Sequence, residues 1–301
     1  MKILITGSNG LLGQKLVYKL KHKNDIELIA SSKGENRIYD KSNYKYISLD
    51  VTNETRVSKI IQEINPDVVI NTAAMTNVDD CEDKKTDCID LNVNAVLFLA
   101  NACFNTGTHL VHISSDFIFD GKSGPYKETD SPNPLSFYGK SKLDSENILN
   151  KHKVDSTILR TIVVFGVGEN LRKNNFVLWA ISSLKNNKKL NVIDDQYRAP
   201  TLAEDLADAC VSAVKKRILG TFHVSGKDIM SIYEMVVKIA KYFNYSCDNL
   251  NKINTSTLSQ KAKRPPKTGF ILDKAKKYLN YKPHSFEECL SIIDKQLNKT
   301  I

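Results

Sequence analysis

The sequence lacks the cysteine and histidine patterns that mark metal-binding and disulfide-rich proteins. Its six cysteines include no Cys-x-x-Cys pair, and its six histidines do not cluster with them. These spacings favour reduced, mostly buried thiols, and they predict no metal site. The cysteines are Cys81, Cys88, Cys103, Cys210, Cys247 and Cys289.

Long apolar runs are missing too. No uninterrupted run approaches the ~20 residues that a membrane helix needs. The apolar start of the chain, Lys2–Thr6, is broken by Gly7 too early for a signal peptide. We therefore expect a cytoplasmic protein with no membrane partner. The chain has 301 residues, 41% of them hydrophobic, which is enough for one large domain or two modest ones.

Acidic residues are outnumbered. The chain has 43 lysines and arginines against 34 acidic residues, which gives a net charge of +9. The lysines are spread over the whole chain, and the densest cluster, residues 261–267 (KAKRPPK), contains no aromatic residue. This pattern favours a solvated basic surface, which would also attract an anionic substrate, and it predicts no nucleic-acid partner.

What the sequence does contain is a regular alternation of short apolar runs and helical periodicity. This alternation predicts an α/β fold built on a doubly wound parallel (Rossmann) sheet with helices on both faces. The expected strands are Lys2–Thr6, Ile26–Ala30, Tyr46–Leu49, Pro66–Asn71, Leu110–Ile113 and Ser156–Leu159. The expected helices include Gln14–Lys21, one that begins near Asn53, Leu91–Phe104 and Phe137–Lys151.

A glycine-rich turn, Gly7-Ser8-Asn9-Gly10-Leu11-Leu12-Gly13, follows the first strand and opens the first helix. Strand, turn and helix in this order are typical of a dinucleotide site. Gly7 would allow the tight turn, Gly10 would let the backbone approach a pyrophosphate, and Gly13 would let the helix pack closely. The helix N-terminus would receive the phosphate charge. We include Asn9 and Leu11 among the expected cofactor contacts; the alternative is a plain glycine turn.

The end of the second strand indicates which dinucleotide would bind. An NAD site usually has an acidic residue there, which holds the ribose 2′-hydroxyl. This chain has Ser31, Ser32 and Lys33, with Arg37 nearby, and these groups suit a 2′-phosphate. The sequence therefore favours NADPH, with NADH as the alternative, although Lys33 and Arg37 would also suit a solvated loop.

Further cofactor contacts are expected where the third and fourth strands end. Asp50, followed by Val51, would either accept from the adenine amino group or cap the next helix. The small residues after Asn71 include Ala73, Ala74 and Thr76. They lie at the carboxyl end of a parallel strand, which faces the ligand in a doubly wound sheet.

A candidate catalytic group lies between His112 and Lys142. Tyr138 and Lys142 are four residues apart, so a helix would place both side chains on one face. A nearby lysine cation lowers the pKa of a phenol, and the hydroxyl of Ser115 could hold a carbonyl oxygen beside it. Together the three side chains suit proton transfer between a carbonyl and an alcohol. Alone, a Tyr-x-x-x-Lys spacing is common on exposed helices.

After Gly166 the alternation loosens. Leu190–Gln196 is expected as a strand, Thr221–Val224 as a strand that returns to the main sheet, and the rest of this half shows no sheet-forming pattern. We expect residues 1–165, joined by 201–226, to form an NADP-binding Rossmann domain. Residues 166–200 and 227–301 would form a smaller C-terminal substrate lobe that caps it.

Several segments together resemble the extended short-chain dehydrogenases/reductases, and within them the dTDP-4-dehydrorhamnose reductase family. The matching segments run in the family's order over nearly the whole chain. They include GSNGLLG at 7–13, HISSDFIFDG at 112–121, PYKETDSPNPLSFYGKSKLDSE at 125–146, VIDDQYRAPT at 192–201 and RPPKTGFILD at 264–273.

The resemblance implies a role for particular residues. It implies Ser115, Tyr138 and Lys142 as catalytic residues, and Gly7, Gly10 and Gly13 as phosphate-binding glycines. It implies that Lys142 also binds the cofactor ribose and that Tyr138 gives its proton to a sugar C4 alkoxide. The expected substrate contacts are Thr76, Ser115, Asn175, Gln196 and Arg198.

Asp116 distinguishes this chain from some relatives. In sugar reductases that also epimerise, such as GDP-fucose synthase, a cysteine follows the catalytic serine. The resemblance therefore implies a reductase without epimerase chemistry, acting on the 4-keto group of a dTDP-linked 6-deoxysugar. Two alternatives stay open: an NADP-binding regulatory β subunit of methionine adenosyltransferase, and a reductase of a UDP-linked sugar. A homodimer is also left open.

Overall fold

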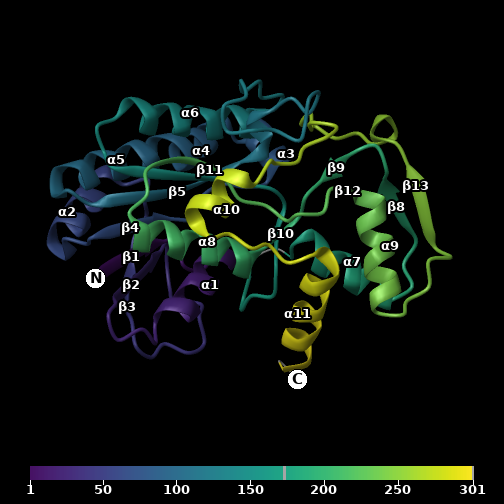
Figure 1. Cartoon of the computed structure of the whole chain (residues 1–301), viewed down its shortest axis with the longest axis horizontal. Helices are drawn as coiled ribbons and strands as arrows, with labels where there is room; N and C mark the ends of the chain where they lie inside the picture. The colour runs from purple at the N-terminus through teal and green to yellow at the C-terminus, as the bar shows by residue number, and fades with distance from the viewer. Residues whose placement is uncertain (172–173, 300–301) are drawn as a thin grey trace.

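A seven-stranded sheet forms the centre of the computed structural model, which describes residues 1–171 and 174–299 (Figure 1). All neighbouring strands in this sheet pair in parallel, in the order β11-β6-β5-β4-β1-β2-β3. The predicted Rossmann fold is therefore confirmed. The strands are β1 (Lys2–Thr6), β2 (Glu27–Ser32), β3 (Lys45–Ser48), β4 (Val68–Asn71), β5 (His109–Ser115), β6 (Ser156–Thr161) and β11 (Gly220–His223).

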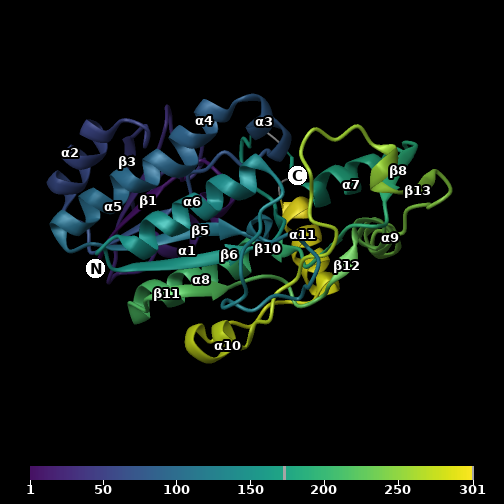
Figure 2. The same ribbon diagram turned by 90° about the horizontal axis from the view of Figure 1, so that it is seen from above.

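Two layers of helices cover the sheet, as Figure 2 shows from above. Alternate residues of β1 explain why both faces are apolar: Ile3 and Ile5 face one helix layer and Leu4 faces the other. The first layer consists of α1 (Leu11–Leu20), α8 (Ala203–Lys216) and α10 (Asp273–Leu279). The second consists of α2 (Glu54–Ile64), α5 (Ala95–Thr106) and α6 (Phe137–Lys151).

A smaller lobe lies beside the carboxyl ends of the strands (Figure 1). Its own apolar core joins three helices with Phe165, Leu202 and Met230 from the connecting strands. Its helices are α7 (Phe176–Lys185), α9 (Ile232–Tyr242) and α11 (Phe286–Lys299). The short strands are β7 (Val164–Phe165), β8 (Leu190–Ile193), β9 (Tyr197–Arg198), β10 (Thr201–Leu202), β12 (Met230–Ser231) and β13 (Leu250–Ile253).

These short strands correct one prediction from the sequence. The second half was expected to have no sheet of its own, yet β13 pairs with β8 in parallel, β12 pairs with β9 and β10 pairs with β7. The two strands of each pair lie far apart along the chain, so local periodicity does not reveal the pairing. The β13–β8 and β10–β7 pairs are parallel and need a crossover, whereas the β12–β9 pair is antiparallel. The strand expected at Thr221–Val224 is found as β11, beside β6.

The helix predicted over Leu91–Phe104 begins earlier. A continuous helical run starts at Lys85 with α4 (Lys85–Ile89), passes through a π-helical turn over Asp90–Asn94, and continues as α5. By length and composition the run Lys85–Thr106 could cross a membrane. In this fold its apolar side chains, such as Val96 and Leu99, are buried against the sheet, which accounts for the composition.

Candidate active site

The glycine turn lies at the carboxyl end of β1, where its backbone leaves no room for larger residues. Gly7 has a φ of +74°, and a Cβ there would lie 2.6 Å from the Ala73 nitrogen. A Cβ on Gly13 would lie 2.5 Å from the Gly7 oxygen. Gly10 is exposed, and its side-chain position meets only the Gly7 oxygen, at 3.2 Å. The turn thus leaves open backbone in front of the N-terminus of α1, and a dinucleotide phosphate fits there.

Asn9 fixes the loop that follows β2. Its amide donates to the Glu35 carbonyl (2.8 Å), and its side-chain oxygen accepts from the Arg37 backbone nitrogen (2.9 Å). Lys33, in the same loop, pairs with Asp50 (2.7 Å). The expected cofactor residues of the first three strand ends therefore meet at one corner of the sheet.

Two expected cofactor residues have other structural tasks. Ser31 is buried and donates to the Ile5 carbonyl (3.1 Å), so its hydroxyl points into the sheet. Asp50 does not cap α2, because Asn53 does so by accepting from the Arg56 nitrogen (2.9 Å). Asp50 instead accepts from the Thr52 hydroxyl (2.7 Å). Among the remaining expected contacts Leu11, Ala73 and Ala74 are half-buried, Val51 is buried and Thr76 is exposed.

Ser115, Tyr138 and Lys142 come together at the carboxyl end of β5. Ser136 caps α6 by accepting from the Gly139 nitrogen (3.2 Å), which places Tyr138 in the first turn and Lys142 one turn later on the same face. The Ser115 hydroxyl hydrogen-bonds the Tyr138 phenol. All three side chains are buried. The arrangement is that of a proton donor held beside a second hydroxyl.

The electrostatics of this group differ from the expectation. Burial raises the pKa of the Tyr138 phenol above its ordinary value, and the Ser115 hydrogen bond lowers it in part. Lys142 was expected to lower the pKa of Tyr138, but its ammonium contributes no principal part of that shift. Burial lowers the pKa of Lys142 itself to about 8.

His112 of β5 lies beneath Lys142 with a fixed tautomer. The Asn71 side-chain oxygen accepts from Thr6 Oγ1 (2.7 Å), so the Asn71 amide nitrogen faces His112 Nδ1 (3.2 Å). Nδ1 must accept this hydrogen bond, and the ring proton is therefore on Nε2. Nε2 donates to Ser145 Oγ (3.1 Å), whose own proton goes to the Lys142 carbonyl (2.7 Å). The network anchors α6 to the sheet.

Asp116 connects the catalytic strand to the smaller lobe. Its carboxylate accepts from the hydroxyls of Ser115 (3.2 Å) and Thr268 (2.5 Å) and lies 3.9 Å from Arg198 Nε. Burial raises the pKa of Asp116, while Arg198, Thr268 and Ser115 lower it in part. Arg198 was expected as a substrate contact; it is buried and also donates to the Tyr197 carbonyl (2.7 Å).

Two other expected substrate contacts, Asn175 and Gln196, form hydrogen bonds within the protein. Asn175 caps α7 by accepting from the Leu178 nitrogen (3.2 Å) and donates to the Gly166 carbonyl (2.7 Å). Gln196 is buried and donates to Thr255 Oγ1 (3.0 Å). Both amides therefore hold the smaller lobe together in this structure.

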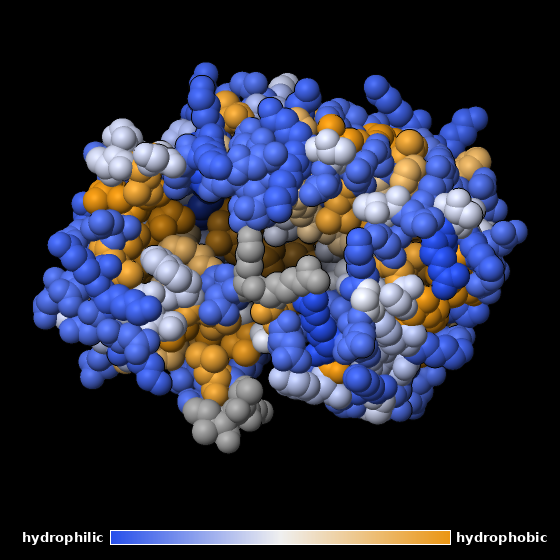
Figure 3. Space-filling view, turned by 180° about the vertical axis from the view of Figure 1, so that it is seen from behind, coloured by the Kyte–Doolittle hydropathy of each residue, from blue (hydrophilic) through white to orange (hydrophobic). Residues whose placement is uncertain are grey.

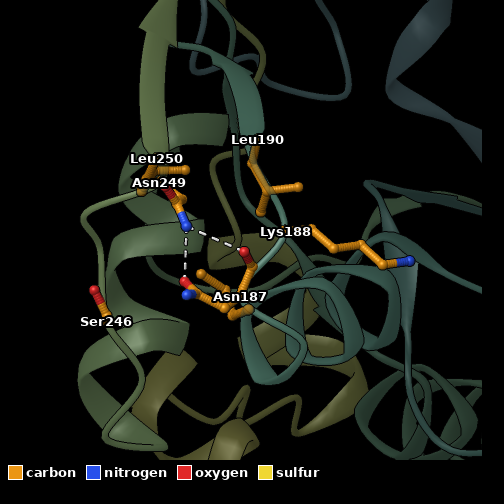
Figure 4. Close-up of a pocket in the computed structure, with 7 residues that line it drawn as sticks. Asn187, Lys188, Leu190, Ser246, Asn249 and Leu250 are labelled. Carbon is orange, nitrogen blue, oxygen red and sulfur yellow. Dashed lines mark hydrogen bonds between the residues drawn. The ribbon is translucent and has the colours of Figure 1, made fainter.

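Figure 3 shows a hollow near the middle of one face with apolar atoms in its depth. A second depression, at the end of α7, is lined by Asn187, Lys188, Ser246 and Asn249 among others (Figure 4). There the Asn249 amide already donates to Asn187 Oδ1 (2.9 Å) and to the Asn187 carbonyl (3.1 Å), which leaves it little capacity for a ligand.

Comparison with known proteins decides the family. The family described as RmlD substrate binding domain matches residues 1–298. The chain belongs to this family. It is similar to a dTDP-4-dehydrorhamnose reductase of Aggregatibacter actinomycetemcomitans, with 33% identity over 97% of this chain and 98% of the relative. It is also similar to the methionine adenosyltransferase 2 subunit beta of Bos taurus, with 34% identity over 85% of this chain and 76% of the relative.

Solved structures agree with this assignment to the RmlD family. A dTDP-4-dehydrorhamnose reductase from Clostridium acetobutylicum has a TM-score of 0.87 and 33% identity, covering 99% of this chain and 100% of that one. The reductase from Bacillus anthracis, solved in complex with NADP, has a TM-score of 0.83 and 28% identity, covering 98% and 99%. A UDP-glucuronic acid 4-epimerase from Bacillus cereus, in complex with UDP-glucuronic acid and NAD, has a TM-score of 0.85 and 25% identity, covering 100% of both chains.

These relatives confirm the resemblance stated from the sequence and the expected class of nicotinamide-dependent oxidoreductase. The cofactors in the two complexes are those expected from the sequence, NADP first and NAD as the alternative. The RmlD relatives include both a reductase and an adenosyltransferase subunit, so family membership alone does not choose between the two roles.

Proposed function

We propose that the chain reduces the 4-keto group of a nucleotide-linked 6-deoxysugar with NADPH, and that its substrate is dTDP-4-dehydro-L-rhamnose. The observation that carries the proposal is the buried group of Ser115, Tyr138 and Lys142 at the carboxyl end of β5. The reductase relatives, which match the chain over nearly its full length, support the substrate class.

The chain's own residues would hold the cofactor and move one proton. The turn Gly7–Gly13 would bind the pyrophosphate, and Ser32, Lys33 and Arg37 would face the 2′-phosphate. Bound NADPH supplies the hydride. Tyr138 would give its phenolic proton to the substrate oxygen as that oxygen becomes an alkoxide, and Ser115 would hold the same oxygen. Lys142 would bind the cofactor ribose.

The division of labour in the chain follows from this proposal. Residues 1–165 and 201–226 would bind the dinucleotide, and residues 166–200 and 227–301 would bind the sugar nucleotide; 172–173 and 300–301 in those ranges lie outside the described residues. Arg198 of the smaller lobe and the exposed Thr76, which follows β4, would contact the substrate. Since Asp116 occupies the position at which epimerising sugar reductases have a cysteine, we propose no epimerase activity. We place the reaction in the cytoplasm; a homodimer stays a prediction.

The decisive experiment follows NADPH consumption with dTDP-4-dehydro-L-rhamnose, beside NADH and beside the UDP-linked analogue. Rapid, dTDP-dependent consumption would support the proposal in full. Equal rates with the UDP-linked sugar would contradict the assignment of a dTDP-linked substrate. The UDP-glucuronic acid 4-epimerase among the similar structures makes this comparison necessary.

Substitution of the proton donor tests the mechanism. Tyr138→Phe should lower kcat at least ~100-fold, the usual scale of general acid catalysis, while NADPH binds as before. Tyr242→Phe is the matched control, because Tyr242 is exposed on α9. Near-normal turnover by Tyr138→Phe would show that another group is the acid.

A second candidate function rests on the adenosyltransferase relatives. In that role the chain would bind NADP and a catalytic partner, with little sugar turnover. Co-purification with a methionine adenosyltransferase, together with tight NADPH binding and no reductase activity, would favour this role.

A further inference from the structure

Two cysteines lie in contact beside the catalytic tyrosine. Cys81 and Cys88 form a buried cluster with Tyr138, surrounded by Met75, Val78, Phe117 and Phe137. The Cys81 thiol donates to the Met75 carbonyl (3.8 Å), and the Cys88 thiol donates to Ser141 Oγ (3.4 Å). The proposed reduction of a sugar uses neither thiol, so this dithiol has no assigned role.

The two short helices that carry these cysteines are each anchored to the protein by few buried side chains. Cys81 is the only buried residue of α3 (Val78–Asp83), and Cys88 is the only buried residue of α4. Residues 83–87, which join the two helices, are all exposed. A segment with so few buried contacts opens locally at much lower cost than the sheet does, and such an opening exposes both sulfurs to a reagent.

Cys88 differs chemically from the other cysteines. The neighbouring Cys81, with Ser141 (3.4 Å), the Asn92 amide (3.5 Å) and the nearby Lys142 cation, lowers the pKa of the Cys88 thiol against the effect of burial. A thiolate is the nucleophile in disulfide exchange. Burial raises the pKa of Cys103, Cys210 and Cys289, which lie in separate core clusters, and Cys247 is exposed.

The same hydrogen bonds connect Cys88 to the catalytic helix. Ser141 lies between Tyr138 and Lys142 on α6 and donates to the Tyr138 carbonyl (2.8 Å). Asn92, in the π-helical turn, donates to Ser141 Oγ (3.0 Å) and holds Met75 through both of its backbone groups (2.8 and 3.0 Å). A change at Cys88 therefore reaches the turn of α6 that positions the proton donor.

We propose that Cys81 and Cys88 form a reversible disulfide when the chain meets a disulfide oxidant such as oxidised glutathione, and that this modification inhibits the enzyme. The inhibition rests on the proposed function; the modification does not. The Cys88 thiolate attacks one sulfur of the oxidant and releases one thiol. Cys81 then loses its proton, attacks the Cys88 sulfur and releases the second thiol, so that two electrons pass from the cysteines to the oxidant.

The test uses the full chain with the exposed cysteine removed, Cys247→Ser. After treatment with oxidised glutathione, intact mass should fall by two hydrogens, and peptide mapping should find Cys81 joined to Cys88. Reductase activity should fall ~10-fold or more, because small displacements at an active site are costly, and dithiothreitol should restore it. Cys88→Ala, which lacks the attacking thiolate, should resist inhibition, and Cys81→Ala should stop at a mixed disulfide with a mass gain of one glutathione. Cys103→Ala, which removes a buried thiol elsewhere, should remain sensitive.

Mass and peptide mapping need no reductase activity and no folded variant, so they decide the modification independently of the proposed function. Oxidation that leaves both thiols free would overturn the proposal, as would a complete disulfide with unchanged activity. If the chain reduces no sugar, NADPH affinity before and after oxidation replaces activity, and an unchanged affinity would overturn the inhibitory part.

Discussion

Lys142 is surrounded by groups that respond to pH in different ways. His112 is held neutral because burial, with the Lys142 cation beside it, lowers its pKa far below the usual range. Burial lowers the pKa of Lys142, while Glu146, Cys88 and Cys81 raise it in part. The lysine Nζ lies 3.4 Å from His112 Nε2, which carries a proton and offers no acceptor. His112 therefore accepts no hydrogen bond from Lys142.

NADPH binding to the free protein should weaken above about pH 8. Below that pH Lys142 is a cation and attracts the anionic cofactor. Above it the protonated fraction of Lys142 falls about tenfold per pH unit, and this attraction is lost. Titration of NADPH by fluorescence between neutral and alkaline pH checks the effect. Lys142→Arg keeps its charge and should remove the inflection, whereas Lys140→Met, an exposed neighbour on α6, should retain it. The same inflection in Lys142→Arg would assign it to another group.

At the scale of elements, two glycines of the turn between β1 and α1 serve different purposes, packing for Gly13 and open backbone for Gly10. Gly13 is required by packing, since its Cβ position lies 2.5 Å from one backbone atom and 2.6 Å from another. Gly10 is required by the fold much less, because its side-chain position is open apart from one contact at 3.2 Å. The two glycines should therefore fail in different ways when replaced by alanine.

Gly13→Ala should destabilise the fold by about 1–3 kcal/mol, the usual cost of forcing an atom into a packed site. Gly10→Ala should keep its unfolding midpoint near that of the parent chain and lose NADPH affinity ~10-fold or more, because the phosphates need the bare backbone. Thermal unfolding and NADPH titration of both variants make the comparison. If Gly10→Ala binds NADPH normally, the phosphate site lies elsewhere.

The elements also show what the sequence could and could not predict. Phe137–Lys151 was predicted to the residue, because a serine cap and helical spacing are local signals. The start of the helix at Lys85 was missed, because Asn92 and Asn94 look like helix-start residues. Asn92 is buried in a π-helical turn because the backbone of Met75 needs it. That requirement is tertiary and leaves no local mark.

Part of the candidate site could likewise be predicted from the sequence, and part could not. Ser115, Tyr138 and Lys142 lie within 28 positions of one another along a recognisable segment. Thr268, which donates to Asp116, lies 152 positions from it along the chain, and only the fold brings the two together. Asn71 and His112 were missed because a strand-end asparagine and a core histidine have no distinctive spacing.

At the scale of the whole molecule, buried histidines make stability depend on pH. Burial lowers the pKa of His109 to about 4 and that of His223 to about 3, and it lowers that of His112 still more clearly. These rings stay neutral in the folded chain at pH values where the unfolded chain, with an ordinary histidine pKa of about 6.5, binds protons. Their contribution to stability is complete above about pH 6.5 and is lost as the pH falls.

The free energy of unfolding should therefore fall between about pH 6.5 and 4, by about 1.4 kcal/mol per pH unit for each buried histidine. Urea unfolding at several pH values gives this slope. His109→Gln should reduce the slope by one histidine's share, and His22→Gln, at an exposed position, should leave it unchanged. A slope that does not respond to His109→Gln would assign the acid sensitivity to carboxylates.

The position of β11 has a consequence for the growing chain. The edge of the sheet beside β6 is closed by residues Gly220–His223, which are synthesised some 60 positions after β6 itself. Until they emerge from the ribosome, β6 is a bare edge with unpaired backbone groups, the kind of surface on which nascent chains aggregate. How long this edge stays open therefore depends on how soon α8 and β11 follow β6 out of the ribosome.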